Sequence, residues 1–397
     1  MAVIGKQEAP SRKLNILIMP SWYFSYKRDN VTAGIFHYEQ AIDLQKYCNI
    51  VVYYPFDQTI DKTMLKHEDR GVLTYRSLFQ RKERIRNRVR IFKTFQTIKE
   101  EFHPDIIFAH VANEVGKYAA FLSSFYHIPL VLMEHSSTEV SLAGKVGYYI
   151  SKYVYEHCDY IACCSENLRD NLQKFFPTLK FHVVYNGIQP ETIMSDTLGN
   201  YRVEDVVNIV IVGAFYSLDI KGYQFLLPAM RQILDKGYKA VLHIIGEGVY
   251  KEHFMQMAVE LGIEEACIFH GDCSREKVYE IVSQMDFFVS ASILECSGVS
   301  VQEAMLLGKP VLVTKSGGAN SLVTEDTAIV VDKGSVQALA NGLEEMIQKY
   351  RDFDVDKIRN YAHNKFEISH ISEQYIQIFN NLVCKSFQWE NDGDNEE

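Results

Sequence analysis

The residues best placed to do chemistry are two carboxylates that bracket a turn of small residues. Glu295 and Glu303 flank the stretch Cys-Ser-Gly-Val-Ser-Val-Gln, and Gly298 lies in the middle of it. The apolar run 287–290 predicts a buried strand before the turn, and the apolar spacing after it predicts a helix that opens at Glu303. A strand, turn and helix in this order point backbone N–H groups and a positive dipole end at an anion. Because carboxylates also accept hydrogen bonds from hydroxyls, the stretch predicts a site for a diphosphate with a sugar at each end.

The elements that must position this turn alternate between strand and helix along the chain. The predicted strands are 14–19, 50–54, 106–109, 130–133, 160–162 and 182–184 in the first half, and 208–212, 240–245, 267–269, 287–289, 311–313 and 328–331 in the second. Amphipathic stretches between them predict helices. This alternation indicates an α/β fold of two Rossmann-like, doubly wound parallel-sheet domains that face a central cleft at the carboxyl ends of their strands.

The length of 397 residues also suggests two domains. We expect the first domain over 1–190 and the second over 206–370, joined by a linker over 191–205 that is rich in Pro, Gly, Ser, Thr and Asp. A helix near 371–390 has no strand after it, so it can pack back on the first domain or on the second. The acidic tail 390–397 is expected to be disordered.

Composition excludes several classes of protein. The formal net charge of −10 argues against a nucleic-acid partner, and no apolar run has the ~20 residues that a membrane helix needs. The eight cysteines show neither a Cys-x-x-Cys pair nor a metal-ligand spacing, so we expect reduced thiols in a cytoplasmic protein. The pairs Asp354/Asp356 and Asp392/Asp394 imitate a metal-binding Asp-x-Asp motif, but we expect no metal at either.

One basic stretch stands out against the negative net charge. Between Arg81 and Lys93 there is one acid, Glu83, and the basic residues include Arg84, Arg86, Arg88 and Arg90. One interpretation is a solvated helix face. The other is an electrostatic dock for anionic membrane headgroups or for a lipid-diphosphate acceptor, which would place the protein at the inner face of the membrane.

Seven landmarks in chain order resemble the retaining glycosyltransferases of family 4, which have the GT-B fold. The resemblance extends from about Leu14 to Leu382. The landmarks are the glycine turn at 33–36, Glu134-His135, Tyr185-Asn-Gly-Ile188, Ile211-Val-Gly213 with Lys221-Gly222, Ile245-Gly-Glu-Gly248, the Glu295 to Glu303 stretch and Ser316-Gly-Gly318.

The resemblance implies transfer of a hexose-type sugar from a UDP- or GDP-sugar to a hydroxyl acceptor, such as a lipid-linked or growing glycan in surface polysaccharide synthesis. The first domain would lie on the acceptor side and the second would bind the donor. No cofactor or metal is implied, because a lysine and a helix end replace the metal. The implied catalytic residues are His135, Lys221 and Glu295, and the implied donor-binding residues are Gly34, Gly213, Gly246, Gly298, Val299, Ser300 and Glu303.

Each implied role has its own chemistry. Glu303 would accept hydrogen bonds from the ribose hydroxyls of the donor, and Glu295 would contact the donor sugar. Lys221 would neutralise charge on the leaving diphosphate, and His135 would contact the sugar near the reacting carbon. His110, which also follows a predicted strand, is interpreted as a buried structural histidine.

One departure from the family pattern leaves other functions open. Ala214 stands where the family usually has the arginine that joins the lysine in holding the diphosphate. A non-catalytic sugar-nucleotide-binding protein therefore remains an alternative, and a sugar-nucleotide epimerase of the same fold is the rival enzyme class. An epimerase would convert the donor without any acceptor, and a binding protein would show affinity without turnover.

Overall fold

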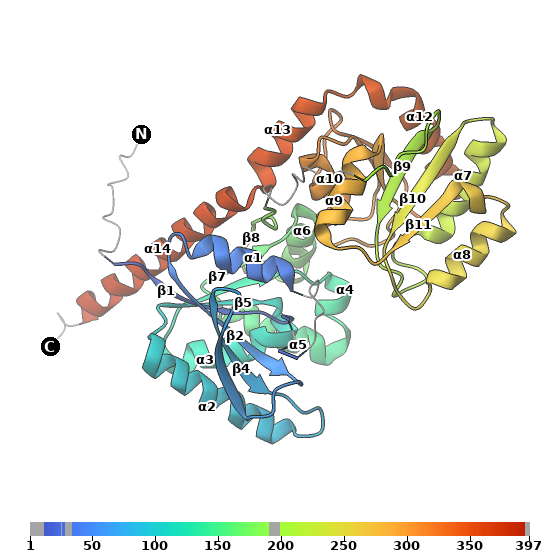
Figure 1. Ribbon diagram of the computed structural model, residues 1–397. Coiled ribbons are helices and arrows are strands. Elements are labelled where there is room, and N and C mark those ends of the chain that lie inside the picture. The colour runs from blue at the N-terminus through green and yellow to red at the C-terminus, as the bar shows by residue number, and fades with distance from the viewer. Residues whose placement is uncertain (1–11, 25, 28–33, 190–198, 394–397) are drawn as a thin grey trace, which may run out of the picture. The chain divides into compact units, whose positions relative to one another are not determined.

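The structure, a computed structural model, describes residues 12–24, 26–27, 34–189 and 199–393. The chain divides into two compact units, each built on its own sheet (Figure 1). The N-terminal unit comprises Met1–Cys164, Arg169–Gly187 and Ile368–Glu397, and the C-terminal unit comprises Ser165–Leu168 and Ile188–Glu367. Residues 191–198 of the predicted linker lie outside the described residues.

The N-terminal unit is built on an eight-stranded sheet with the order β3-β4-β2-β1-β5-β6-β7-β8. Its strands are β1 (Asn15–Met19), β2 (Asn49–Asp57), β3 (Met64–Asp69), β4 (Val72–Leu78), β5 (Ile106–His110), β6 (Leu130–Glu134), β7 (Tyr160–Cys163) and β8 (Phe181–Val183). The central strands β1, β5 and β6 are almost wholly buried. Their sequences are therefore continuous apolar runs, as expected for parallel strands covered on both faces.

The β3–β4 hairpin corrects the prediction of a wholly parallel sheet. These two strands pair antiparallel, and β4 then pairs parallel with β2. Arg70 and Gly71 form the turn with φ values of 52° and 87°, as a tight hairpin turn of the right twist requires. The sequence pattern missed β3 because this edge strand, Met-Leu-Lys-His-Glu-Asp, is partly exposed and carries no apolar run.

The helices of the N-terminal unit cover this sheet. They are α1 (Ile35–Leu44), α2 (Arg84–Phe102), α3 (Lys117–Tyr126), α4 (Thr138–Ser141), α5 (Gly144–Glu156), α6 (Glu166–Phe175) and α14 (Ile368–Gly393), with a π-helical turn η1 (Val111–Gly116) before α3. The prediction of a helix from 115 to 126 therefore misses its irregular first turn.

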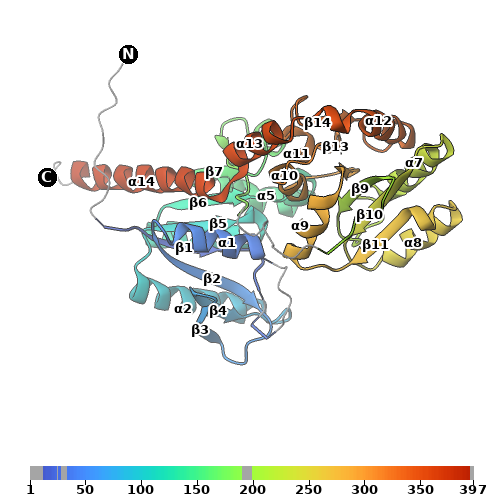
Figure 2. The same cartoon turned by 45° about the horizontal axis from the view of Figure 1, so that its top comes forward.

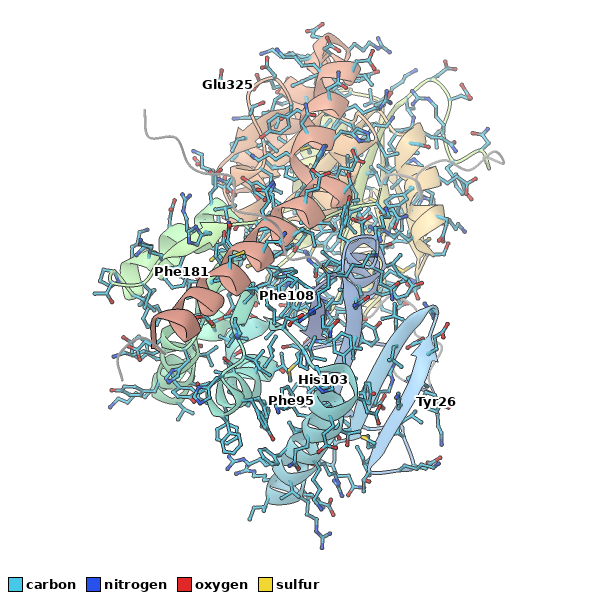
Figure 3. All side chains as sticks on the ribbon, turned by 90° about the vertical axis from the view of Figure 1, so that its left-hand side faces the viewer. Tyr26, Phe95, His103, Phe108, Phe181 and Glu325 are labelled. Carbon is cyan, nitrogen blue, oxygen red and sulfur yellow. The ribbon has the colours of Figure 1, made fainter. Side chains whose placement is uncertain are left out.

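The C-terminal helix α14 belongs to the N-terminal unit and lies beside α1 (Figures 1 and 2). Phe108, on β5, is labelled in Figure 3. Its ring lies 4.6 Å from that of Tyr375 and 5.6 Å from that of Phe379, both on α14, measured between ring centroids. Helix α14 continues to Gly393, so the tail predicted from residue 390 overlaps the end of this helix. Residues 394–397 lie outside the described residues.

The C-terminal unit is built on a six-stranded sheet with the order β11-β10-β9-β12-β13-β14, and its pairings are all parallel. The strands are β9 (Val207–Val212), β10 (Ala240–Ile245), β11 (Cys267–Gly271), β12 (Phe287–Ser290), β13 (Val311–Thr314) and β14 (Ala328–Val331). The helices are α7 (Tyr223–Asp235), α8 (Lys251–Glu260), α9 (Arg275–Gln284), α10 (Val299–Leu306), α11 (Gly318–Ser321), α12 (Val336–Lys349) and α13 (Val355–Phe366), with short 3₁₀ turns η3 (Glu264–Ala266) and η4 (Tyr350–Asp352).

The core of this unit determines where its loops emerge. The neighbouring strands β10, β9 and β12 bury their apolar residues against α7 and α12. The rings of Phe215, Tyr223 and Phe254 contact one another in this core, with centroids 4.6 to 5.7 Å apart. Because the three strands are parallel neighbours, their carboxyl ends meet at one edge of the sheet. That edge carries the segments after Val212, Ile245 and Ser290.

Candidate functional site

The predicted anion turn lies at this edge, between β12 and α10. Gly298 caps α10 with φ 79° and ψ 48°, a left-handed conformation that favours glycine. A Cβ atom there would come 3.1 Å from the Cα of Ala319. The N–H groups of Val299 and Ser300 begin the helix, and no hydrogen-bond acceptor for either lies among the described residues. They are therefore available to an anion.

Glu303 differs from its predicted position because α10 begins at Val299, four residues before it. The carboxylate therefore projects from the second turn of the helix and not from its start. Its Oε1 accepts hydrogen bonds from the Tyr279 hydroxyl at 2.8 Å and from Arg275 Nη2 at 3.1 Å. The Glu303 side chain is only 15% exposed, so these bonds fix its orientation.

Arg275 and Tyr279 are site residues that the sequence reasoning missed. Both lie on α9, four residues apart, and therefore share one face of that helix. Arg275 also bonds to the Tyr279 hydroxyl. Burial, with the neighbouring Glu303 carboxylate, raises the pKa of Tyr279, which keeps the hydroxyl protonated as a donor. The available signal was an Arg and a Tyr at helical spacing directly after the N-cap Ser274.

Lys221 and Glu295 come together although they are far apart in the chain. Lys221 Nζ lies 2.8 Å from Glu295 Oε2, and Ser292 Oγ lies 3.3 Å from the same oxygen. The Lys221 loop is held close to the end of β12, because a Cβ atom on Gly222 would lie 1.9 Å from the carbonyl oxygen of Ala291. The two residues that were predicted to serve the diphosphate and the sugar separately thus form one half-buried ion pair.

Gly213 and Gly246 bring the ends of β9 and β10 into backbone contact. A Cβ atom on Gly246, whose φ is 153°, would lie 2.2 Å from the carbonyl oxygen of Gly213. The same oxygen accepts a 2.8 Å hydrogen bond from the Tyr223 hydroxyl. This close approach of two backbone segments explains Gly246, whereas a Cβ atom on Gly213 would lie 3.1 Å from the Tyr223 hydroxyl; Ala214 follows directly.

His135 belongs to the N-terminal unit, where it follows β6. Its Nε2 lies 2.9 Å from Nδ1 of His110, so His110 is a direct partner of the predicted site residue. Burial lowers the pKa of His135 to about 3 and lowers that of His110 as well, so both rings are neutral at physiological pH. Gly34 lies in the same unit, where it caps the N-terminus of α1 with φ 84°. A Cβ atom on Gly34 would clash, because it would lie only 2.8 Å from Tyr23 Cα.

Glu134 fixes the backbone around His135. This wholly buried carboxylate accepts hydrogen bonds from the backbone N–H groups of Ala112, His135 and Ser136 and from the Tyr155 hydroxyl, at 2.9 to 3.1 Å. Burial raises its pKa above the ordinary range of a glutamate. The Glu-His pair in the sequence thus combines a structural anchor with a candidate site residue.

The basic stretch forms the start of α2, and its arginines do not all face solvent. Arg86 and Arg90 pair with Glu83 at 2.8 and 2.6 Å, and the Arg90 side chain is only 15% exposed. Arg84 and Arg88 are exposed. The four arginines therefore divide into two that are engaged within the helix start and two that are available to a partner.

An apolar surface continues from these arginines onto α3 and α5. Large apolar side chains exposed there are Ile85, Val89, Phe121, Phe125, Val146, Tyr149 and Tyr153. A cavity of about 790 Å³ lies among α2, α3 and α5, and a second of about 370 Å³ adjoins it on α5. We call these exposed side chains and the two cavities the apolar face. In the described part of the chain, no helix is long and apolar enough to cross a membrane.

The structure describes one of the two Asp-x-Asp pairs completely and the other in part. Asp354 caps α13 and accepts hydrogen bonds from the N–H groups of Asp356 and Lys357, both at 3.0 Å. Helix capping therefore accounts for this pair without a metal. Asp392 lies in the last turns of α14, and Asp394 lies outside the described residues.

Comparisons with known proteins identify the family. Residues 202–365 match the family described as glycosyl transferases group 1, and residues 46–192 match glycosyltransferase family 4. An uncharacterized glycosyltransferase of Methanocaldococcus jannaschii is 25% identical over 336 residues, which covers 83% of this chain and 88% of the relative. An alpha-monoglucosyldiacylglycerol synthase of Streptococcus pneumoniae is 25% identical over 289 residues, covering 67% and 65%.

Solved structures show the same fold. Sucrose-phosphate synthase from Thermosynechococcus elongatus matches with a TM-score of 0.74 at 15% identity, over 94% of this chain and 100% of that one. The Anabaena protein HepE in complex with UDP matches with a TM-score of 0.73 at 18% identity, over 93% and 100%. The prediction of two α/β domains of the GT-B type is confirmed. The chain is a glycosyltransferase of the GT-B type, with a first half that belongs to glycosyltransferase family 4 and a second half that belongs to the glycosyl transferases group 1.

Proposed function

We propose that this glycosyltransferase moves a hexose-type sugar from a nucleoside-diphosphate sugar to a hydroxyl acceptor with retention of anomeric configuration. The orientation of the Glu303 side chain on α10 carries the proposal. Tyr279 and Arg275 occupy its Oε1, and no described residue donates a hydrogen bond to its Oε2. Oε2 is available to the ribose hydroxyls, while the first N–H groups of α10 are available to the diphosphate.

The ion pair between Lys221 and Glu295 supports a charge-exchange step. As the bond to the sugar breaks, negative charge develops on the leaving diphosphate, and Lys221 with the N-terminus of α10 stabilises it. The diphosphate replaces Glu295 as the partner of Lys221, which releases the Glu295 carboxylate to the sugar hydroxyls. An oxygen of the leaving phosphate takes the acceptor proton, so the step requires no protein base. The contact of His135 with the sugar stays a prediction of the resemblance.

The donor can be tested first among UDP-sugars. The Anabaena protein HepE has been crystallised with UDP, with UDP and glucose, and with UDP-glucose. Thermal-shift measurements with UDP, GDP and their sugars will identify the base, because a ligand at ~100 times its dissociation constant adds about 2.7 kcal/mol of stability.

Two substitutions test the site once a donor is identified. We expect Glu303→Gln to weaken donor binding by at least ~10-fold, since hydrogen bonds to a charged group contribute about 1.5–3 kcal/mol. We expect Lys221→Met to lower kcat by ~10²–10³, the usual effect of removing one stabilising group from a developing anion. Glu325→Gln, at an exposed carboxylate of the same unit, is the matched control. Full transfer activity in both site variants would refute the assignment.

Product analysis separates the alternatives. Nuclear magnetic resonance of the product gives its anomeric configuration, and nucleoside diphosphate release is measured with and without acceptor. Conversion of the donor sugar in the absence of acceptor would identify an epimerase instead. Donor binding by calorimetry with no turnover on any acceptor would identify a binding protein.

For the acceptor, we propose a lipid-linked hydroxyl presented at an anionic membrane that contacts the apolar face. The exposed basic residues Arg84, Arg88, Lys93 and Lys145 border the apolar side chains of this face. Each Lys or Arg near an anionic bilayer contributes about 1 kcal/mol of attraction. The similarity to the pneumococcal alpha-monoglucosyldiacylglycerol synthase supports diacylglycerol as the first acceptor to test.

Vesicle co-sedimentation tests this contact directly. We expect binding to phosphatidylglycerol vesicles and little binding to phosphatidylcholine vesicles. Val146 is 73% exposed and Ile85 is 77% exposed, so Ile85→Glu and Val146→Glu should reduce binding without disturbing the core. Val259→Glu, at a 52% exposed position on α8, is the matched control. Equal sedimentation of all variants would exclude the apolar face as the membrane contact.

A further inference from the structure

Three histidine side chains from different elements of the N-terminal unit lie close together. His37 lies on α1, His110 ends β5 and His135 follows β6. One ring nitrogen of each lies within 4.8 Å of those of the other two. The ring of His37 stands nearly perpendicular to that of His110, at 81°, with centroids 4.3 Å apart.

Burial leaves most of these nitrogens without partners. His37 and His110 are wholly buried. Both nitrogens of His37, and Nε2 of His110, have no hydrogen-bond partner among the described residues. A buried polar atom without a partner costs free energy, and such atoms are rare in folded proteins unless a water or an ion satisfies them. Three of them in one cluster indicate an occupant.

A second histidine pair in the chain shows how this fold satisfies imidazoles when no occupant is needed. His243 and His270 are bonded Nδ1 to Nε2 at 3.0 Å with nearly parallel rings, as His110 and His135 are. There the remaining nitrogen of His243 bonds to Asn208 Oδ1 at 3.1 Å. No such amide completes the His37 cluster among the described residues.

We propose that His37, His110 and His135 form a binding site for one divalent transition-metal ion of the zinc class. The imidazoles supply three nitrogen ligands, and the fourth position remains open to water. Zinc–nitrogen bonds of about 2.0–2.1 Å in a tetrahedron place ligand nitrogens ~3.3 Å apart. The nitrogens of His110 and His135 are now 2.9 Å apart, and the cluster spans at most 4.8 Å, so small ring rotations suffice.

The surroundings favour the metal-binding form of each ring. Burial holds the pKa of all three histidines below the ordinary value, so the rings are neutral and need lose no proton to bind an ion. The backbone N–H of His135 is held by Glu134 at 3.0 Å, which fixes the segment that carries this ligand. On binding, the hydrogen bond between His110 and His135 is replaced by two bonds to the ion. The proposal depends on this geometry alone and not on the proposed function.

Cobalt and zinc binding to the full chain test the site. The protein is treated with a chelator, dialysed and titrated with Co²⁺ and Zn²⁺. We expect one ion per chain, the visible absorption of tetrahedral cobalt with nitrogen ligands, and a higher thermal midpoint with Zn²⁺. His37→Phe retains the ring volume and removes a ligand. It should weaken binding by more than ~100-fold, because changes behind the ligands already cost 10–100-fold.

His270→Ala removes a histidine of the other pair and should leave metal affinity unchanged. Without metal, His37→Phe should fold with an equal or higher thermal midpoint, because it removes two unsatisfied nitrogens. The proposal is overturned if the wild-type chain binds no ion, if His37→Phe binds equally well, or if the sulfur-to-cobalt absorption of a cysteine site appears instead.

Discussion

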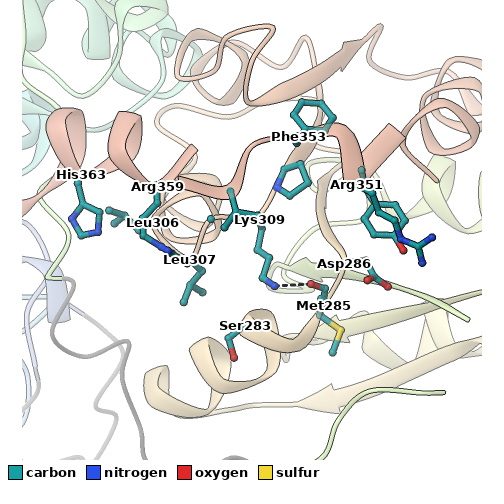
Figure 4. A pocket seen from close by; sticks show the side chains of 14 residues that line it. Ser283, Met285, Asp286, Leu306, Leu307, Lys309, Arg351, Phe353, Arg359 and His363 are labelled. Carbon is teal, nitrogen blue, oxygen red and sulfur yellow. Dashed lines mark hydrogen bonds between the residues drawn. The ribbon is translucent and has the colours of Figure 1, made fainter. Parts of the chain in front are cut away.

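Lys309 provides the sharpest test of how burial determines stability in this protein. It lies at the cavity of about 760 Å³ among α9, α10, η4 and α13, and its Nζ donates a 2.7 Å hydrogen bond to the carbonyl oxygen of Met285 (Figure 4). Burial, opposed by Asp286 and reinforced by Arg202 and Arg359, lowers its pKa from 10.5 to about 8. The charged form is therefore less stable in the folded protein than in water.

The size of this effect follows from the pKa difference. A pKa lowered from 10.5 to about 8 corresponds to about 3 kcal/mol of destabilisation while the group is charged in both states. Lys309→Met removes that cost and loses one hydrogen bond worth ~1 kcal/mol. We therefore expect Lys309→Met to raise the free energy of unfolding by ~2 kcal/mol at pH 7.

The pKa of Lys309 also determines whether the stability of the wild type rises or falls with pH. Below about pH 8 the amine is charged in the folded and the unfolded chain, so the wild type carries the full cost. Between about pH 8 and pH 10.5 the folded chain has lost this proton while the unfolded chain retains it, so the stability of the wild type rises with pH. The advantage of Lys309→Met should accordingly shrink across this window.

Urea unfolding at pH 7, 8, 9 and 10 measures this difference. Lys315→Met is the matched control, since Lys315 pairs with Asp332 at an exposed site and its loss should change stability by less than ~1 kcal/mol. A Lys309→Met variant that is less stable at pH 7, or whose advantage is constant from pH 7 to pH 10, would refute the reasoning.

Three further substitutions test other contacts. Tyr279→Phe should weaken donor binding by ~10-fold with little change in kcat, because it removes a hydrogen bond that orients the Glu303 carboxylate. Calorimetry with the identified donor measures the affinity, and an unchanged affinity would contradict the prediction. Gly222→Ala should lower the free energy of unfolding by more than ~2 kcal/mol in urea titrations, because its left-handed backbone and the Ala291 carbonyl exclude a Cβ atom; a neutral effect would mean that the loop shifts at no cost. Arg76→Ala should lower the free energy of unfolding by about 3–5 kcal/mol in the same titrations, because it leaves the buried Asp57 carboxylate without its arginine partner. A decrease below ~1 kcal/mol would show that water reaches that carboxylate.

The sequence predicted most of the fold because the central strands are buried on both faces. Continuous apolar runs at β1, β5, β6, β9, β10 and β12 are visible without any knowledge of their neighbours. The edge strand β3 was missed for the opposite reason, since a partly exposed strand needs no apolar run. Strand β4 is mostly buried and was missed because polar residues interrupt its apolar ones. The helix start at Val299 was placed too late because Val299 and Ser300 have little helical signal of their own, and Gly298 caps the helix by its conformation.

The sequence by itself determined the family, the order of the elements and the position of the glycine turns, because motif spacing and apolar runs are local properties of the chain. Only the tertiary structure decided which side chains meet. It paired Lys221 with Glu295, placed Arg275 and Tyr279 behind Glu303, and gathered His37, His110 and His135 from three elements. These contacts join residues that are 24 to 98 positions apart. They arise from strand order and helix packing, which no short stretch of sequence specifies.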